Sequence, residues 1–166
     1  MKLITTFILL YLFSYQTIYG QDTTAQINKA WTNLKTQLQK RAGIISNLTS
    51  ILSKSTKVDK EQLNNSKLFS IDLFNYVDTL SFKDSLTISL ASMKNNKLTQ
   101  ALAKTLATLE NNKKFRSDKQ LQGLLMQLEG CENRIALAKR DYNSVCEEYG
   151  KTNLLFSSGN IEKHLK

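Results

Sequence analysis

The chain contains no proline, and it has no glycine between Gly43 and Gly123. Folds built from strands and tight turns need a turn about every ten residues, and Gly, Pro and Asn supply most of those turns. Because only Asn and Ser are available over this stretch, a few long helices are favoured over many short strands. The 166 residues are enough for one domain, and the apolar content of 41% is enough for a core.

Two segments carry the apolar spacing of long amphipathic helices. In residues 26–53, and again in residues 118–149, apolar side chains recur at alternating steps of three and four. Such a stripe is not stable alone in water, so each helix must pack against partners. The stripe positions are Ile27, Trp31, Leu34, Leu38, Arg41 or Ala42, Ile45, Leu48 and Leu52 in the first segment, and Leu121, Leu124 or Leu125, Leu128, Cys131, Ile135, Ala138, Tyr142, Val145 or Cys146 and Tyr149 in the second.

Two weaker segments lie between them. Residues 98–109 predict a third amphipathic helix. Residues 57–96 are harder to interpret, because residues 86–90 also alternate as in a strand; in a chain without proline we prefer helix, with a break near Ser81 and Phe82. The prediction is therefore an all-α fold, an elongated antiparallel up-and-down bundle of three or four long helices after an N-terminal apolar leader.

The last predicted helix holds two glycines and both cysteines of the chain. Gly123 and Gly130 each cost up to about 1 kcal/mol relative to Ala, which favours a close approach of another helix there, with a local kink as the alternative. Cys131 and Cys146 are about 22 Å apart along a straight helix, whereas a disulfide needs Cα atoms within about 7 Å. We therefore interpret the cysteines as small buried apolar residues. No Cys or His spacing fits a zinc site, so no metal is predicted.

Residues 1–20 have the features of a signal peptide or a membrane anchor. Lys2 is followed by a strongly apolar run of about eleven residues and then by a softer stretch that ends at Gly20. Cleavage near Gly20 is one interpretation, and a retained anchor is the other, because residues 3–19 are just long enough to cross a bilayer. In both cases we expect the rest of the chain to be exported across the inner membrane, either secreted or periplasmic after cleavage or tethered by residues 3–19.

The formal net charge is +9, of which +8 remains without residues 1–20 and their single Lys2. Lysines and arginines are spread along the whole chain, which is typical of charge that only keeps a protein soluble. The densest cluster, Lys113, Lys114 and Arg116, gives the alternative of a patch that binds an anionic membrane surface or cell-envelope polymer. Because nucleic-acid binding is inconsistent with export, no nucleic-acid partner is predicted.

Two stretches resemble the LemA family. One consists of a Trp, then Gln-Leu with basic residues, then an aliphatic pair before Asn-Leu, and it occupies residues 31–48. The other is a Leu-x-Gly-x-Glu-Asn-Arg-Ile helix that continues to Tyr-Asn and a further Tyr; it occupies residues 128–149, with its Tyr-Asn pair at Tyr142 and Asn143. The resemblance implies the family's plan of an N-terminal apolar segment followed by an elongated antiparallel bundle. It carries over no biochemical activity.

The chain departs from the family's pattern at several places. Ser46 stands where the family usually has proline, so the kink that proline would cause is not expected, and Cys131 replaces a hydroxyl residue. The family's apolar C-terminal segment is reduced to residues 154–156. The organisation predicted after the leader is a LemA-like helical bundle at residues 26–150 and a polar, frayed tail at residues 151–166.

The sequence contains no motif for catalysis or for cofactor binding. Its one histidine, His164, lies near the end of the chain, and no nucleophile elbow, phosphate loop or HExxH motif occurs. The polar residues of the late stretch are interpreted as a structural network with the first helix, because partly buried charges need partners, and an acid–base site is the alternative. The expected network consists of Gln37, Arg41, Glu129, Glu132, Asn133 and Arg134.

These observations predict a protein that is not an enzyme and that has no catalytic residue, metal or cofactor. We expect an interaction or scaffold module of the cell envelope whose partner is an envelope protein, and self-association is compatible with the same features. The alternative function is salt-sensitive binding of anionic lipid or cell-envelope polymer through the basic surface.

Overall fold

The structure is a computed structural model that describes residues 2–54, 58–80, 84–110, 115 and 117–157; of residues 2–22 and 110 it describes the backbone alone. Within these residues the chain is all-helical and has no strand, as predicted. The elements are α1 (Lys2–Leu52), α2 (Lys60–Thr79), α3 (Ser85–Glu110), α5 (Lys119–Glu148) and the short 3₁₀ helix η1 (Thr152–Leu154).

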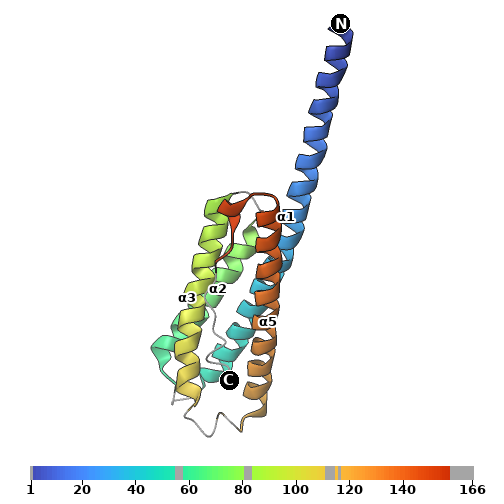
Figure 1. Ribbon diagram of the computed structural model, residues 1–166. Coiled ribbons are helices and arrows are strands. Elements are labelled where there is room, and N and C mark those ends of the chain that lie inside the picture. The colour runs from blue at the N-terminus through green and yellow to red at the C-terminus, as the bar shows by residue number, and fades with distance from the viewer. Residues whose placement is uncertain (1, 55–57, 81–83, 111–114, 116, 158–166) are drawn as a thin grey trace.

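The long helices form the predicted antiparallel up-and-down bundle, in which α1 and α3 run one way and α2 and α5 the other (Figure 1). Helix α1 packs against both α2 and α5, and α3 packs against α2. The side between α3 and α5 is different, because these two helices make far less extensive contact and η1 contacts both of them. The N-terminal part of α1 projects beyond the bundle and is continuous with the part that packs inside it (Figure 1).

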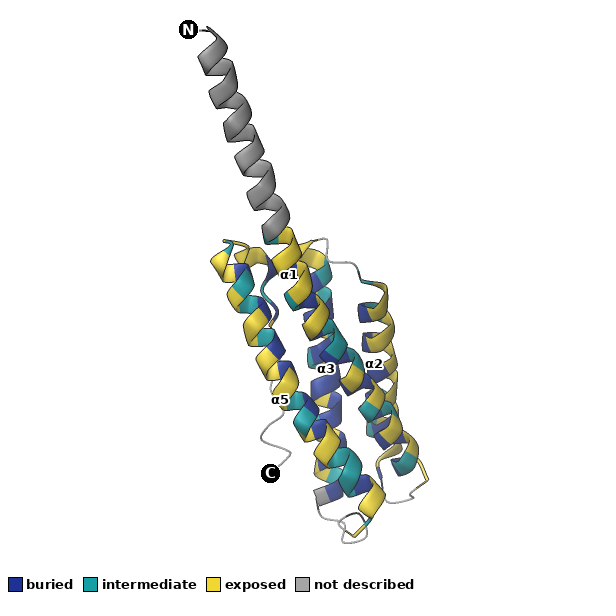
Figure 2. Ribbon diagram, turned by 90° about the vertical axis from the view of Figure 1, so that its right-hand side faces the viewer, coloured by how far each residue is buried: buried dark blue, intermediate teal, exposed yellow. Residues whose placement is uncertain are grey.

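The core is built from the two predicted stripes. Figure 2 shows the buried positions of the helices on the sides that face one another. In α1, Leu34, Leu38 and Ile45 have no exposed surface. In α5 the fully buried positions include Leu128 and Tyr142. Complete burial of one large apolar side chain stabilises a fold by about 1.5–3 kcal/mol. The two buried stripes are therefore a main source of the stability of the bundle.

The structure settles the ambiguous middle of the chain. Helix α2 ends at Thr79 and α3 begins at Ser85, so the predicted break is confirmed, although Ser81 and Phe82 themselves lie outside the described residues. Residues 86–90 are part of α3, and the strand alternative is wrong. Helix α3 is also longer than the segment that the spacing at residues 98–109 predicted.

Three aspartates begin the helices after α1. The carboxylates of Asp59, Asp84 and Asp118 each accept a hydrogen bond from a backbone N–H in the first turn of α2, α3 and α5. The hydrogen bond from the Thr87 N–H lowers the pKa of Asp84. Because a lowered pKa favours the ionised form in the folded state, this cap stabilises the fold above the ordinary Asp pKa and is lost as the pH falls through the lowered value.

The glycines of α5 do not mark a close helix approach, and that expectation is wrong. A Cβ placed on Gly123 would have no atom within 4 Å, and one on Gly130 would lie 3.5 Å from Nη1 of Arg134, which belongs to the same helix. Helix α5 runs unbroken through both positions, as α1 runs unbroken through Ser46.

Gly123→Ala is therefore expected to stabilise the bundle by up to about 1 kcal/mol, because it removes backbone freedom from the unfolded chain and meets no obstacle. Urea denaturation followed by helical circular dichroism measures the change. Gly150→Ala is the matched control: Gly150 has φ +66°, where a side chain is strained, so it should lose stability. A loss at Gly123 would contradict the open space around it.

Residues 151–157 correct the expectation of a frayed tail. Helix α5 ends in a Schellman turn, in which the Gly150 and Lys151 N–H groups donate to the Glu147 and Cys146 carbonyls. The chain then turns back along the bundle through η1, and Leu154 and Phe156 are buried in the core. Residues 158–166 lie outside the described part of the chain.

Candidate functional site

The most deeply buried charge in the described residues belongs to Arg41 of α1, whose side chain is 1% exposed. Its Nε donates to Oε1 of Glu132 on α5 at 2.5 Å. Its Nη1 donates to Oδ1 of Asn95 at 2.6 Å, and its Nη2 donates to Oγ1 of Thr99 at 3.0 Å. One guanidinium thus connects α1 to α5 and to α3, across the side where α3 and α5 make little direct contact.

This arrangement fits a structural role. An arginine at a stripe position must enter the core, and a guanidinium taken out of water needs hydrogen-bond partners at each nitrogen. Thr99 Oγ1 in turn donates to the Asn95 carbonyl, which fixes the acceptors that face Arg41. Because the acceptors lie at set heights on α3 and α5, the network favours one register of these helices over the others.

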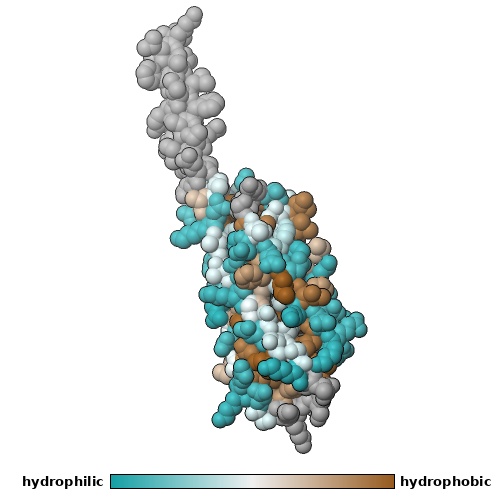
Figure 3. Space-filling model, turned by 180° about the vertical axis from the view of Figure 1, so that it is seen from behind, coloured by the Kyte–Doolittle hydropathy of each residue, from teal (hydrophilic) through white to brown (hydrophobic). Residues whose placement is uncertain are grey.

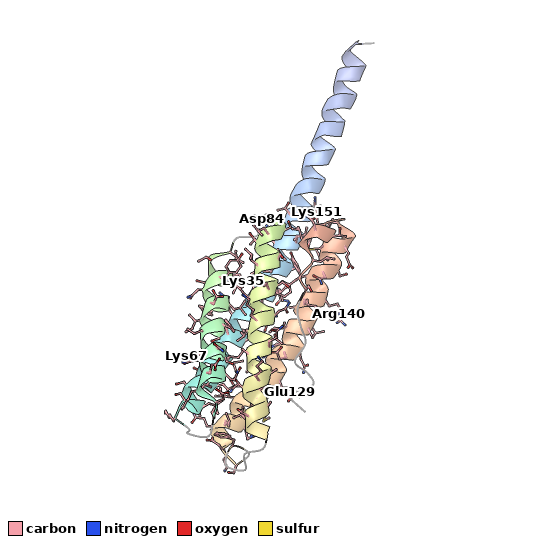
Figure 4. The ribbon with its side chains drawn as sticks, turned by 90° about the vertical axis from the view of Figure 1, so that its left-hand side faces the viewer. Lys35, Lys67, Asp84, Glu129, Arg140 and Lys151 are labelled. Atoms are coloured by element: carbon pink, nitrogen blue, oxygen red, sulfur yellow. The ribbon has the colours of Figure 1, made fainter. Side chains whose placement is uncertain are left out.

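The other predicted members lie at different places. Gln37 is buried, but it meets α5 through its backbone carbonyl, which accepts a hydrogen bond from Cys131 Sγ at 3.6 Å. The side chains of Glu129, Asn133 and Arg134 are exposed and lie outside the buried pair. Figure 4 labels Glu129 in the part of α5 that is remote from the leader. An acid–base site at Glu129, the alternative to the structural network, would therefore be exposed to solvent and not enclosed in a cavity.

Sequence reasoning missed Asn95 and Thr99 of α3. A signal was present, because Asn95 occupies a position of the apolar stripe that Ile88, Ala91, Leu98 and Leu102 continue. A polar residue at such a position needs a buried partner, and Arg41 is the one charged residue of the α1 stripe.

A second cluster of polar groups lies at the end of the bundle nearest to the leader. There the Tyr142 hydroxyl donates to the Leu154 carbonyl at 3.0 Å. The Asn143 side chain accepts from the Phe156 N–H at 2.8 Å and donates to the Phe156 carbonyl at 3.1 Å. The Trp31 ring contacts the rings of Tyr142 and Phe156, with centroids 5.6 and 6.3 Å away. Burial raises the pKa of Tyr142, so its hydroxyl stays protonated and can donate.

A shallow hollow of about 220 Å³ lies between α1 and α2. Ile71 and Phe74 of α2 line it together with several small residues. Its lining contains no ionisable side chain: the residues are Ala42, Gly43, Ser46, Ser70, Ile71, Phe74 and Asn75.

Two predicted features fall where the structure gives no description of side chains. The basic patch of Lys113, Lys114 and Arg116 lies outside the described residues, and so do the side chains of the leader at residues 1–20. Among the helices whose side chains are described, none is long and apolar enough to span a bilayer. The same part of the chain holds no group of three or more His, Cys, Asp and Glu placed for a metal ion.

Both cysteines are buried and form no disulfide, as the helical spacing predicted. Burial raises the pKa of the Cys131 thiol, and the Glu132 carboxylate adds to that effect. Burial likewise raises the pKa of Cys146. Since the thiolate is the reactive form, neither group is suited to act as a nucleophile.

We expect the two thiols of the folded chain to react with Ellman's reagent at least about tenfold more slowly than those of the urea-unfolded chain. The absorbance of the released thionitrobenzoate measures the rate. Ser144→Cys is the matched control, because Ser144 is exposed on the same helix, and its thiol should react rapidly in the folded state. Fast reaction of Cys131 or Cys146 near neutral pH would contradict the burial.

Comparison with known proteins identifies one family. A family model described as the LemA family matches residues 30–165, a range that includes Trp31, Arg41, Glu132 and the Tyr142-Asn143 pair. A comparison with curated proteins gives no match. Because the family model covers most of the chain, the protein belongs to the LemA family.

Proposed function

We propose that this LemA family member is a non-enzymatic interaction or scaffold module of the cell envelope. The observation that carries the proposal is the exposed apolar side of α2, where Leu68, Ile71 and Phe74 are 60%, 43% and 41% exposed. Grouped large apolar side chains on a surface are typical of protein–protein contacts. Ile71 and Phe74 also line the hollow against α1, so a partner side chain can insert there.

The surface of the bundle has both apolar and polar areas, which suits a reversible protein–protein contact better than a permanent one. Figure 3 views the bundle from behind and shows apolar areas separated by polar ones. Obligate interfaces are more continuously apolar. The proposed contact is therefore with a separate envelope protein.

The continuity of α1 supports a scaffold role. Residues 23–52 of this helix span about 45 Å, and the segment that we expect to lead the chain across the membrane joins them without a break (Figure 1). If the leader is retained, the bundle stands upright on the membrane, and its contact surface is held at a fixed height. If the leader is cleaved, the same bundle is a soluble exported module.

Geometry restricts the electrostatic alternative. The helix ends at Glu110 and Lys119, which flank the basic patch, lie at the end of the bundle remote from the leader (Figure 1). Helix α3 is about 39 Å long, so a membrane that holds the leader lies several Debye lengths from the two helix ends between which the sequence has Lys113, Lys114 and Arg116. The alternative thus requires an envelope polymer or a facing membrane, with salt-sensitive binding that weakens when these residues are neutralised.

Fractionation and site-specific crosslinking test the proposal. The chain should fractionate with the envelope or the exported proteins, and a photoreactive residue at Ile71 should crosslink to a discrete partner. The matched control is the same probe at Leu137, an aliphatic residue of α5 that is 50% exposed. Intact chain in the cytosol, equal crosslinking from both positions, or a turnover assay lost on changing Glu129 or Glu132 would each refute the proposal.

A further inference from the structure

Residues 154–157 of the chain lie against α3 and α5, and the surface that they cover is here called the groove; it includes Trp31, Ser92, Asn96, Tyr142 and Asn143. Phe156 is 1% exposed and Leu154 is 8% exposed; Leu154 is the last residue of η1, and Phe156 follows it in a stretch without regular structure. They are two positions apart, and the backbone of Leu155 between them is extended. Leu155, between them, is only partly buried. The segment is thus anchored by an aliphatic side chain and an aromatic one.

The remaining contacts of the groove are with the main chain of the segment. Tyr142 binds the Leu154 carbonyl, and Asn143 binds both the N–H and the carbonyl of Phe156. From α3, Ser92 Oγ and Asn96 Nδ2 donate to the Ser157 carbonyl. Side chains that hold the backbone of an extended segment and leave only two positions to pockets are typical of peptide recognition.

The manner of attachment allows the segment to leave. It follows α5, so its release leaves the chain connections between α1, α2, α3 and α5 unchanged. The turn at Gly150 joins the segment to α5, and Figure 4 labels Lys151, the next residue, at the end of the bundle near the leader. A covalently attached segment experiences an effective concentration in the millimolar range, so even modest intrinsic affinity keeps it bound.

We propose that this groove is a binding site for an extended peptide segment of a partner protein, with an aliphatic residue two positions before an aromatic one, and that residues 154–157 occupy it as an internal ligand. The inference rests on the proposed interaction function and names a second contact and its chemistry. In this proposal Tyr142 and Asn143 bind the ligand, since both side chains form hydrogen bonds with its backbone.

One group of the groove is not satisfied by the internal ligand. The indole N–H of Trp31 is buried and has no hydrogen-bond acceptor among the described residues, although its ring contacts Phe156. A buried donor without an acceptor is unfavourable. A partner segment that offers a hydroxyl or carbonyl oxygen at this place would bind more tightly than the chain's own residues.

The test uses a fluorescent synthetic peptide with the sequence of residues 151–157 and measures its anisotropy with the full chain. The Leu154→Ser/Phe156→Ser variant, whose groove is vacated, should bind the peptide at least about tenfold more tightly than the natural chain, in which the internal ligand competes. Adding Asn143→Ala to that variant should weaken binding about tenfold, through the loss of two hydrogen bonds. Asn133→Ala, an exposed asparagine on the same helix, is the matched control.

The outcomes separate clearly. If the Leu154→Ser/Phe156→Ser variant folds but does not bind the peptide, the inference is overturned. It is also overturned if a peptide that carries Phe156→Ser binds this variant as tightly as the natural peptide does. Should the variant fail to fold, a protease site inserted between Gly150 and Lys151 leaves every groove residue natural. After cleavage, exchange of the cut segment for labelled peptide supports the inference, and its absence overturns it.

Sedimentation distinguishes the source of the ligand. A concentration-dependent dimer of the natural chain that Phe156→Ser abolishes would show that the groove takes the segment of a second copy, and would overturn the assignment to a partner protein. If no peptide binds while Ile71 still crosslinks to its partner, this inference fails and the proposed function stands.

Discussion

Arg41→Ala is expected to destabilise the bundle by about 3–5 kcal/mol, which is a large part of the stability of a domain of this size. The substitution removes the positive charge that faces the Glu132 carboxylate, which is 11% exposed. It also leaves Asn95 Oδ1 and Thr99 Oγ1 without the donors that they have in the natural chain. Urea denaturation followed by circular dichroism gives the free energy of unfolding of both chains.

A double-mutant cycle shows whether the loss belongs to the ion pair. Arg41→Met and Glu132→Met should each cost about 3 kcal/mol or more, because each removes one partner of the ion pair, whereas the double variant should lose clearly less than their sum. Glu129→Ala, an exposed carboxylate on the same helix, should change the stability by less than about 0.5 kcal/mol. Additive losses at Arg41 and Glu132 would show that the two side chains do not stabilise one another.

The parts of the fold that were predictable from sequence depend on short-range patterns. The α1 and α5 stripes repeat over many turns, and periodicity of that length fixes both the helix and its buried face. Arg41 was expected to have a partner on α5 because it sits in the α1 stripe, and Glu132 contacts it. The break near Ser81 and Phe82 was also predicted, and α2 ends at Thr79 while α3 begins at Ser85.

The remaining features depend on contacts between distant segments. Asn95 and Thr99 contact Arg41 only because α3 faces α1 at that height, and no local pattern gives that register. Glu129 and Glu132 are three positions apart, yet only Glu132 reaches the interior, since helix rotation decides which of two nearby carboxylates faces α1. Likewise, Gly123 and Gly130 suggested a close approach that the packing does not make.

The tail was misjudged for a related reason. Residues 151–157 have little periodicity, and short apolar runs near a chain end usually fray. Their burial depends on contacts with Trp31 of α1 and with Tyr142 and Asn143 of α5. These residues are distant from the segment in the sequence, so no local pattern indicates the contacts. The Gly150 turn that directs the chain into this groove was the one local signal, because a glycine directly after a long helix is typical of a reversal.

Phe156→Ala is the second substitution with a large expected effect, a loss of about 3 kcal/mol or more of unfolding free energy, although the residue lies only ten positions from the last one in the chain. The ring is 1% exposed and contacts Trp31, so its removal leaves a cavity at the end of the bundle. Chemical denaturation measures the loss, and the fluorescence of Trp31, the one tryptophan, should report the changed surroundings in the folded state.

Asn153→Ala is the control for this prediction, because Asn153 is an exposed residue of the same segment and its loss should change stability by less than about 0.5 kcal/mol. The natural peptide of residues 151–157, added in excess to the Phe156→Ala chain, should recover part of the lost stability, since a ligand that binds only the folded state stabilises it by mass action. Equal stability of the Phe156→Ala and natural chains would show that the segment does not pack in the groove in solution. The same result would remove the internal ligand on which the peptide-binding proposal depends.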